Sequence, residues 1–206
     1  MRIGILGAGN VGGALGESWA RHGHEVFFGV RNPEAADVLA LLKRCGARGR
    51  AEMPADAVRS GDVIVNALPW PATKAVLESL DLAGKVLLDC TNPLKPDLSG
   101  LEVGTTTSGG ELVASWAPGA KVVKIFNTTG FANMANPVYD GKSITMTYCG
   151  DDAGAKQTAA SLARDIGFDP IDAGPLSNAV YWSPMHCCGS GWLLKEASGG
   201  ALRFRL

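Results

Sequence analysis

A glycine-rich stretch near the start of the chain has the spacing G-x-G-x-x-G. It reads Gly7-Ala8-Gly9-Asn10-Val11-Gly12, after an apolar run and before a helical pattern. In this context the first glycine permits a tight turn, the second lets backbone approach a bound group, and the third lets helix and strand pack closely. The free N–H groups and the positive dipole end of the helix hold phosphates. These six residues therefore predict a pyrophosphate-binding turn, as found in dinucleotide sites.

The end of the second expected strand indicates which dinucleotide is preferred. An NAD site usually has Asp or Glu there, about 20 residues past the glycines, to bind the ribose 2′-hydroxyl. Here the strand ends in Phe28-Gly29-Val30-Arg31-Asn32, with no acid at its tip. A guanidinium is a bidentate phosphate partner, so Arg31 suits a 2′-phosphate. The sequence favours NADP over NAD, and the alternative is that Arg31 is an exposed strand-end residue without a ligand.

Three further strands are expected to end in segments that suit a cofactor wall. The segments are Ala67-Leu68-Pro69, Thr91-Asn92-Pro93 and Asn127-Thr128. Ligands of an open parallel sheet bind outside the carboxyl ends of its strands, so these residues are predicted to face the nicotinamide. The two prolines fix the backbone beside a flat ring, and the two asparagines offer amide groups that orient a carboxamide. For each asparagine alone, the alternative is a turn residue bonded to nearby backbone.

The sequence predicts no catalytic acid or base. Reduction of a carbonyl needs a general acid, usually His, Lys or Tyr, and no Tyr-x-x-x-Lys pair occurs. His22 and His24 follow the first helix, far from the strand carboxyl ends. Only His186 could approach the cleft, and the favoured expectation for it is a packed or exposed helix residue. Cys187-Cys188 lacks the context of a low-pKa redox pair, and nothing specifies a metal. Such a site suits an acceptor that does its own proton chemistry, such as a flavin or deazaflavin.

The elements that must position these residues alternate between strand and helix. Strands are expected over 1–6, 24–30, 62–68, 85–89, 121–126, 143–149 and 168–172, with a weaker strand or loop over 47–52. One helix is expected directly after the glycine turn, and a second from Pro33 to about 46, with Asn32 as its cap. Further helices are expected over 55–60, 72–80, 108–116 and 153–167, and from Asn178 onward. The segments 94–107 and 131–141 are expected to be loops. This alternation predicts an α/β, Rossmann-like, doubly wound and mostly parallel sheet of about eight strands, with helices on both faces. We expect one domain over 1–206, with 1–130 as the dinucleotide-binding core and 131–206 completing the sheet and closing the fold.

Composition and charge indicate an ordinary globular protein. The 206 residues are 46% hydrophobic and 19% charged, with a formal net charge of −1, which argues against nucleic acid or an anionic membrane as partner. No apolar run approaches a membrane span, and a strand with a phosphate turn occupies the place of a signal peptide. Five cysteines without a C-x-x-C pair fit a reduced protein. We therefore expect a cytoplasmic protein.

Several motifs, in the same order, resemble the deazaflavin-dependent NADP reductases, the coenzyme F420-dependent NADP oxidoreductase family. They lie at residues 3–12 with 29–33, then 89–93, 121–127 and 172–178. They are also similar to the cytosolic NADPH-binding domain of the six-transmembrane ferric reductases, which shares the Arg-Asn-Pro ending. The resemblance implies that residues 7–12 and Arg31 bind NADP, and that residues 67–69, Asn92 and Asn127 line the nicotinamide side. Hydride would then pass directly between nicotinamide and deazaflavin.

Three functions remain in competition. The first is an NADP(H)-dependent oxidoreductase that transfers hydride between the nicotinamide and a small flavin- or deazaflavin-type acceptor. The second is an imine or hydroxy-acid dehydrogenase, whose usual large helical domain has no space in 206 residues. The third is a catalytically inert NADP(H)-binding or sensor module acting with a partner protein. The acceptor, the direction of transfer and the oligomeric state, with a homodimer as one option, stay open.

Overall fold

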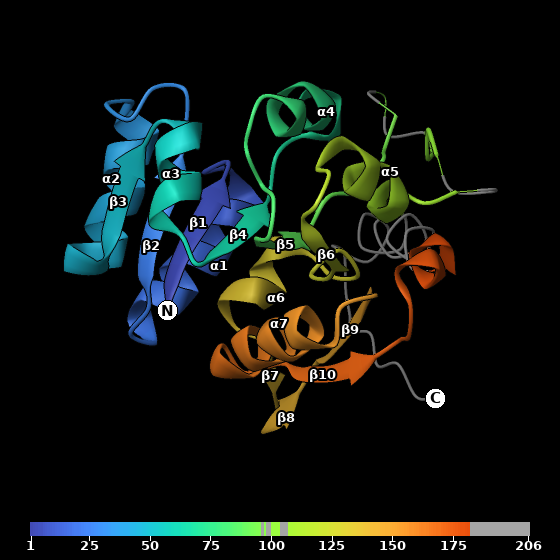
Figure 1. Cartoon of the computed structure of the whole chain (residues 1–206). Helices are drawn as coiled ribbons and strands as arrows, with labels where there is room; N and C mark the ends of the chain where they lie inside the picture. The colour runs from blue at the N-terminus through green and yellow to red at the C-terminus, as the bar shows by residue number, and fades with distance from the viewer. Residues whose placement is uncertain (96, 98–99, 104–106, 182–206) are drawn as a thin grey trace.

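The computed structural model describes residues 1–95, 97, 100–103 and 107–181, and one large sheet dominates it (Figure 1). Within these residues the sheet has eight strands in the order β10-β9-β6-β5-β4-β1-β2-β3. The strands are β1 (Arg2–Leu6), β2 (Glu25–Gly29), β3 (Gly49–Glu52), β4 (Val63–Asn66), β5 (Val86–Asp89), β6 (Lys121–Lys124), β9 (Thr145–Gly150) and β10 (Asp169–Asp172). All neighbours run parallel except β6 and β9. The predicted Rossmann-like, mostly parallel sheet is confirmed.

Helices cover both faces of this sheet (Figure 1). One face carries α1 (Asn10–Arg21), α2 (Ala36–Cys45), α6 (Phe131–Ala135) and α7 (Ala153–Asp165), and the other carries α3 (Pro54–Ser60), α4 (Trp70–Glu78) and α5 (Gly109–Trp116). The remaining elements are short: η1 (Gly46–Arg48), η2 (Leu176–Asn178) and a hairpin of β7 (Val138–Tyr139) and β8 (Lys142–Ser143). The carboxyl ends of β1, β2, β4, β5 and β6 therefore meet at one edge, where the sequence places its candidate residues.

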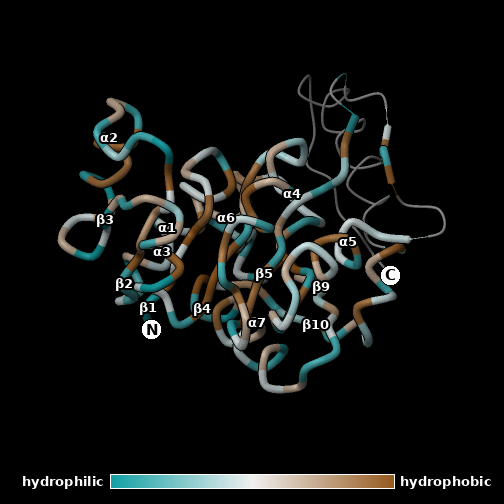
Figure 2. Tube along the Cα trace, turned by 45° about the horizontal axis from the view of Figure 1, so that its top comes forward, coloured by the Kyte–Doolittle hydropathy of each residue, from teal (hydrophilic) through white to brown (hydrophobic). Residues whose placement is uncertain are grey.

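Strand alternation sends side chains into two separate cores. Ile5 and Val65 pack with α1 and α7, whereas Leu6 and Ile64 pack with α3, α4 and α5. Figure 2 shows brown hydrophobic segments in the interior of the trace, and teal segments mainly on the outer turns. Both faces of the central strands are buried, as expected for a parallel sheet covered by helices.

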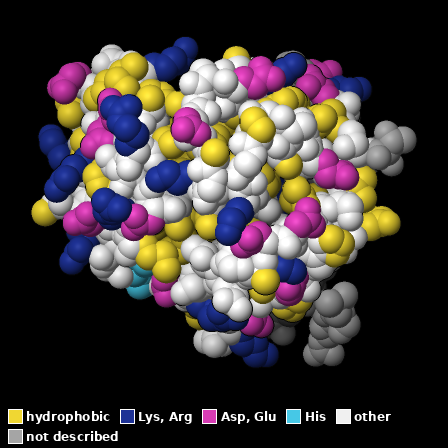
Figure 3. All heavy atoms as spheres, in the orientation of Figure 1, with side chains coloured by type: hydrophobic (Ala, Val, Ile, Leu, Met, Phe, Trp, Pro, Cys, Tyr) yellow, Lys and Arg dark blue, Asp and Glu magenta, His cyan; other side chains and the backbone are white. Residues whose placement is uncertain are grey.

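The visible surface carries charges of both signs. Figure 3 shows Lys and Arg side chains interspersed with Asp and Glu over this face, as the net charge of −1 suggests. Among the helices of the described residues, none is long and apolar enough to cross a membrane.

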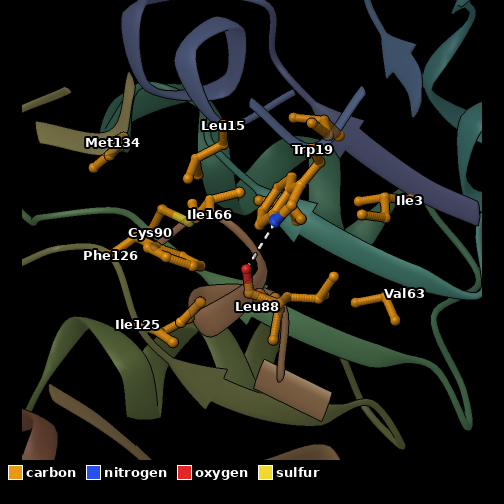
Figure 4. Close-up of a cluster of buried hydrophobic side chains, with 14 of the residues drawn as sticks. Ile3, Leu15, Trp19, Val63, Leu88, Cys90, Ile125, Phe126, Met134 and Ile166 are labelled. Atoms are coloured by element: carbon orange, nitrogen blue, oxygen red, sulfur yellow. Dashed lines mark hydrogen bonds between the residues drawn. The ribbon is translucent and has the colours of Figure 1, made fainter. Parts of the chain in front are cut away.

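Trp19 joins the amino-terminal part of the chain to the carboxyl-terminal part. Its side chain lies in the larger core, where the indole N–H donates a 2.9 Å hydrogen bond to the carbonyl oxygen of Leu162 in α7 (Figure 4). The ring also meets Phe126 edge to face, with 5.8 Å between centroids. Buried aromatic pairs of this geometry add stability beyond the area they bury.

The first difference from the sequence prediction concerns the start of α2. We expected Asn32 to cap a helix that begins at Pro33, but α2 begins at Ala36 with Ala35 as its N-cap residue. The Asn32 carboxamide oxygen accepts a 3.2 Å bond from the Glu34 N–H, and the Asn32 carbonyl accepts one from the Ala35 N–H. Asn32 therefore closes a turn before the helix, which is the competing role of Asn in loops.

The second difference is in the expected loop over 131–141. This segment contains the short helix α6 and the strand β7. Met134 is the buried residue of α6 and packs in the core beside α1. This one side chain anchors α6 to the rest of the protein. A single anchor gives no hydrophobic period that sequence inspection can detect. The closing helix expected from Asn178 onward, with His186, Cys187 and Cys188, falls mainly outside the described residues.

Candidate functional site

The glycine turn connects β1 to α1, and its three glycines have different surroundings. Gly7 has φ +99°, a conformation that strains any residue with a Cβ. A Cβ on Gly12 would overlap the Gly7 carbonyl oxygen and approach the Ile5 side chain, so this position needs close backbone contact. A Cβ on Gly9 would meet nothing within 4 Å. Gly7 and Gly12 serve the turn itself, whereas Gly9 leaves open space over the helix start.

The start of α1 is free to receive an anion. Gly9 is its N-cap residue and supplies no side-chain acceptor, and the first turn holds no acidic residue. Ala8 and Val11 are half-buried beside the turn, and Asn10 is exposed. Uncapped N–H groups and the helix dipole both favour negative charge at this point.

The tip of β2 lies directly beside the turn. The Gly7 N–H donates a 3.1 Å bond to the Gly29 carbonyl, and the Val30 N–H donates a 2.9 Å bond to the Glu52 carbonyl at the end of β3. These bonds fix the tip that carries Val30, Arg31 and Asn32. Arg31 is exposed and has no ion pair or hydrogen bond with any described residue. Its guanidinium is therefore available to a ligand held at the glycine turn.

A cavity of about 330 Å³ opens next to the turn, at the carboxyl ends of β4, β5 and β6. Of the residues that the sequence analysis selected, six line it: Val11, Ala67, Leu68, Pro69, Thr91 and Asn92. Residues that the analysis did not select also line it, among them Trp70, Lys95, Phe126 and Thr129. The lining is mostly apolar with a few polar groups, which is the usual character of a site for an organic ligand.

Two selected residues lie behind the wall of the cavity. Asn127 is only 2% exposed, and its side-chain amide donates a 3.3 Å bond to the carboxamide oxygen of Asn92. In return the Asn92 amide donates a 3.0 Å bond to the Asn127 carbonyl. Pro93 is buried against Gly109 at the start of α5. Contrary to expectation, Asn127 and Pro93 do not line the cavity. The side chain of Asn127 is hydrogen-bonded to Asn92, and Pro93, the next residue after Asn92, packs against Gly109.

Phe126 has an unusual backbone at the end of β6. Its φ is +64°, in the left-handed region that bulky side chains rarely adopt. The ring packs against Trp19 and against Phe168, with centroid distances of 5.8 and 6.0 Å. Strain of this kind persists only where packing holds it, and it is common at functional sites.

Proton chemistry has few candidates at the cavity. No His, Tyr, Asp or Glu is found in its lining among the described residues, and Lys95 is the one charged side chain there. Cys90 is one of the lining residues, but burial raises the pKa of its thiol, so the thiol stays protonated at neutral pH. The described residues also contain no group of three or more His, Cys, Asp and Glu arranged to hold a metal.

Two charged residues that the sequence analysis did not select lie directly behind the wall. Asp89 and Lys124 end β5 and β6, and both are essentially buried, at 0% and 1% exposed. The available signal was a lysine at the end of the strand Lys121–Lys124 and an acid at the end of the strand Val86–Asp89. Charged residues are almost never fully buried unless they are paired, so a charged residue at the end of a buried strand indicates a buried ion pair.

Comparison with known proteins gives consistent matches. A family profile described as NADP oxidoreductase, coenzyme F420-dependent, matches residues 2–93. A crystal structure from Arthrobacter sp. FB24, provisionally described as an F420-dependent NADP reductase, is 30% identical, covers 96% of this chain and 94% of that chain, and has a TM-score of 0.83. The F420-dependent NADP reductase of Methanocaldococcus jannaschii is 28% identical over 87% of this chain and 86% of its own length.

A second group of relatives is much longer. Metalloreductase STEAP3 of Rattus norvegicus is 32% identical over 86% of this chain. The match covers 35% of that protein, so the chain spans about a third of its length.

Proposed function

Because the chain belongs to the coenzyme F420-dependent NADP oxidoreductase family, we propose that it binds NADP(H) at the glycine turn and transfers a hydride between the nicotinamide and a flavin- or deazaflavin-type acceptor. When bound, NADP(H) supplies or accepts that hydride. The protein's own residues bind the two molecules, orient them and exclude water.

One observation supports the cofactor more than any other. The open space over Gly9 and the unpaired guanidinium of Arg31 lie at adjoining strand ends, joined by the bond between Gly7 and Gly29. The helix start suits a pyrophosphate, and Arg31 suits a 2′-phosphate on the adjacent ribose. A cofactor without the 2′-phosphate would leave Arg31 without a partner. These residues fit NADP(H) better than NAD(H).

The cavity supports the acceptor class. Its walls are apolar or carry neutral hydroxyl and amide groups, apart from Lys95. A carbonyl substrate would need a proton donor at the reacting oxygen, and apart from Lys95, whose side chain is exposed, the described lining offers no Lys, His, Tyr or carboxylic acid. A flavin or deazaflavin takes its proton from solvent after reduction, and therefore needs mainly orientation from the protein.

A second candidate function follows from the STEAP3 match. The chain corresponds to only 35% of that metalloreductase, so it could act as an NADP(H)-binding module whose partner protein carries the acceptor. In that case NADPH binds, but free flavins and deazaflavins are not reduced. Turnover with free acceptors separates the two functions.

The first test is a calorimetric titration with NADPH and NADH. We expect NADPH to bind at least about tenfold more tightly, or about 1.4 kcal/mol, and Arg31→Ala to abolish that preference. Arg50→Ala is the matched control, since Arg50 is an exposed arginine on the neighbouring strand β3, where it lies over the Phe27 ring. Equal binding of both nucleotides by wild type would contradict the NADP(H) assignment.

The second test measures oxidation of NADPH at 340 nm with FMN, FAD, riboflavin and a deazaflavin as acceptors. Steady turnover with a flavin or deazaflavin, and none with simple ketones or imines, supports the proposed reaction. Tight NADPH binding without turnover on any free acceptor supports the binding module instead.

A further inference from the structure

Three polar residues form a row across the centre of the sheet. Asn66, Asp89 and Lys124 are the last residues of β4, β5 and β6. They are direct partners in the strand register, Asn66 with Asp89 and Asp89 with Lys124. All three are buried, with 0%, 0% and 1% exposure. The row therefore lies at the carboxyl ends of these three strands, next to the residues that line the cavity.

The row holds Thr91 by every polar group of that residue. Asp89 Oδ1 accepts bonds from the Thr91 N–H at 3.2 Å and from the Thr91 hydroxyl at 2.8 Å. Lys124 Nζ donates to the Thr91 carbonyl oxygen and, at 2.8 Å, to Asp89 Oδ2. The backbone of Thr91 is thus fixed on both sides by one ion pair.

Asn66 extends the row to the opposite wall of the cavity. Its amide donates a 3.0 Å bond to Asp89 Oδ1, and its carboxamide oxygen accepts a 3.5 Å bond from the Leu68 N–H. Leu68 and Thr91 both line the cavity. One network therefore connects two walls that belong to different strands.

Stability alone does not account for a buried ion pair here. Removing two charges from water is costly, and apolar residues of similar volume often stabilise a core equally well or better. The pair does, however, provide directional bonds that an apolar pair cannot provide. Because the pair lies directly behind the cavity, its hydrogen bonds can fix the position of the backbone that forms the cavity wall.

We propose that Lys124 and Asp89 are positioning residues that hold the Thr91–Asn92 wall at the distance hydride transfer requires. The inference rests on the proposed function, since it assigns the wall to the nicotinamide and acceptor. Neither charged group touches the ligands. They act through the Thr91 backbone, which carries Asn92 into the cavity. Because a misplacement of about 1 Å can cost about 100-fold in rate, loss of the pair is expected to slow transfer far more than it weakens NADPH binding.

The test variant removes both charges together. Lys124→Met with Asp89→Asn avoids an unpaired buried charge and leaves Thr91 without the lysine donor at its carbonyl. Val122→Ala is the matched control, because Val122 lies two residues earlier in β6 on the same face and is 5% exposed. It weakens packing around the strand without touching Thr91.

The first readout is hydrogen exchange of the Thr91 amide in the nucleotide-free protein. We expect exchange at least about tenfold faster in the double variant than in Val122→Ala at matched thermal stability. The second readout is kinetic. NADPH affinity should stay within about threefold, kcat should fall about 10- to 100-fold, and the isotope effect with 4-deuterated NADPH should rise.

Different outcomes overturn different claims. Unchanged Thr91 exchange in the folded double variant overturns the positioning role alone. Faster exchange with unchanged kcat also overturns it, because the wall would then not govern transfer. Absence of NADPH binding and turnover in wild type overturns the proposed function and the positioning role with it. If the double variant does not fold, Lys124→Gln with Asp89→Asn takes its place: it keeps polar side chains in the row but removes the ion pair beside Thr91, and unchanged exchange and kcat there overturn the proposal.

Discussion

The indole N–H of Trp70 donates a 3.0 Å hydrogen bond to a carboxylate oxygen of Glu102. Trp70 begins α4 and lines the cavity, whereas Glu102 belongs to the segment that follows β5. The Trp70 ring also packs against Trp116 of α5, with 5.2 Å between centroids and 44° between planes. The ring is therefore held from two directions, as expected of a platform for a flat ligand.

Replacing Trp70 should weaken binding of the acceptor more than binding of the nucleotide. Aromatic stacking adds about 0.5–1.5 kcal/mol, so we expect Trp70→Leu to raise the KM for a flavin or deazaflavin about three- to tenfold. Trp70→Phe should keep most of the affinity. Steady-state kinetics with each acceptor, beside NADPH titrations, measures both effects, and an equal loss of NADPH affinity would argue against a stacking role.

The glycine turn allows binding and folding to be separated. Gly9→Ala adds a methyl group into open space, so the free energy of unfolding should change by no more than about 1 kcal/mol. NADPH affinity should nevertheless fall at least about tenfold, because the methyl group would stand where the pyrophosphate approaches the backbone. Calorimetry and urea unfolding on the same preparation test this.

Gly12→Ala, in contrast to Gly9→Ala, should lower the free energy of unfolding directly. Its Cβ would overlap the Gly7 carbonyl, and overpacking of this kind costs about 1–3 kcal/mol. We expect a lower unfolding midpoint in urea even without nucleotide. A Gly12→Ala protein as stable as wild type would mean that the backbone at Gly12 does not approach the Gly7 carbonyl closely enough to exclude a methyl group.

The charge of Lys95 should favour an acceptor that becomes negative on reduction. Lys95 lines the cavity and is exposed, so its interaction with the acceptor is partly screened by solvent. We expect Lys95→Gln to lower kcat/KM for the acceptor about two- to fivefold, and Lys95→Glu to lower it further. The loss should shrink in high salt. Lys74→Gln, on the exposed side of α4, is the control.

Stability should depend on pH through His24. His24 is 8% exposed, and burial, followed by the nearby N-terminal ammonium, lowers its pKa, while Asp165 at 3.2 Å opposes the shift. The unfolded chain then binds a proton near the ordinary pKa of 6.5, before the native protein does. The free energy of unfolding should therefore fall as the pH drops below about 6.5. Urea unfolding at several pH values should show a smaller fall in His24→Gln than in wild type, and an equal fall would exclude this histidine as the cause.

Three buried cysteines should resist alkylation. Cys45, Cys90 and Cys149 are buried free thiols, and burial raises the pKa of Cys149 to about 11. In a Cys187→Ser, Cys188→Ser background, iodoacetamide at pH 8 should therefore react slowly with the native protein and with three thiols after unfolding. Mass spectrometry counts the adducts. Rapid labelling of the native protein would show that the core opens locally.

Local signals in the sequence predicted the strand–turn–helix unit correctly. The positions of Gly7, Gly9 and Gly12 are set by backbone geometry within a few residues, so their spacing alone carries the information. The alternation of apolar strands and helical patterns likewise identified the sheet. These features depend on neighbours along the chain and not on distant contacts.

What the sequence could not predict depends on register between strands. Asn92 and Asn127 are 35 residues apart, and only the alignment of β5 with β6 shows that one supports the other. The same alignment pairs Asp89 with Lys124. A polar residue at a strand end looks the same in the sequence whether it faces a ligand or a neighbouring strand, and a shift of one residue would exchange the two.

The bond between Trp19 and Leu162 has a consequence for protein synthesis. The glycine turn and α1 are translated before α7, and the acceptor for the Trp19 indole lies 143 residues later. Until α7 is made, this N–H has no native partner and the apolar surface around it is uncovered. A buried polar group without its partner is costly, so α1 is expected to remain only loosely ordered in the nascent chain until α7 has been translated.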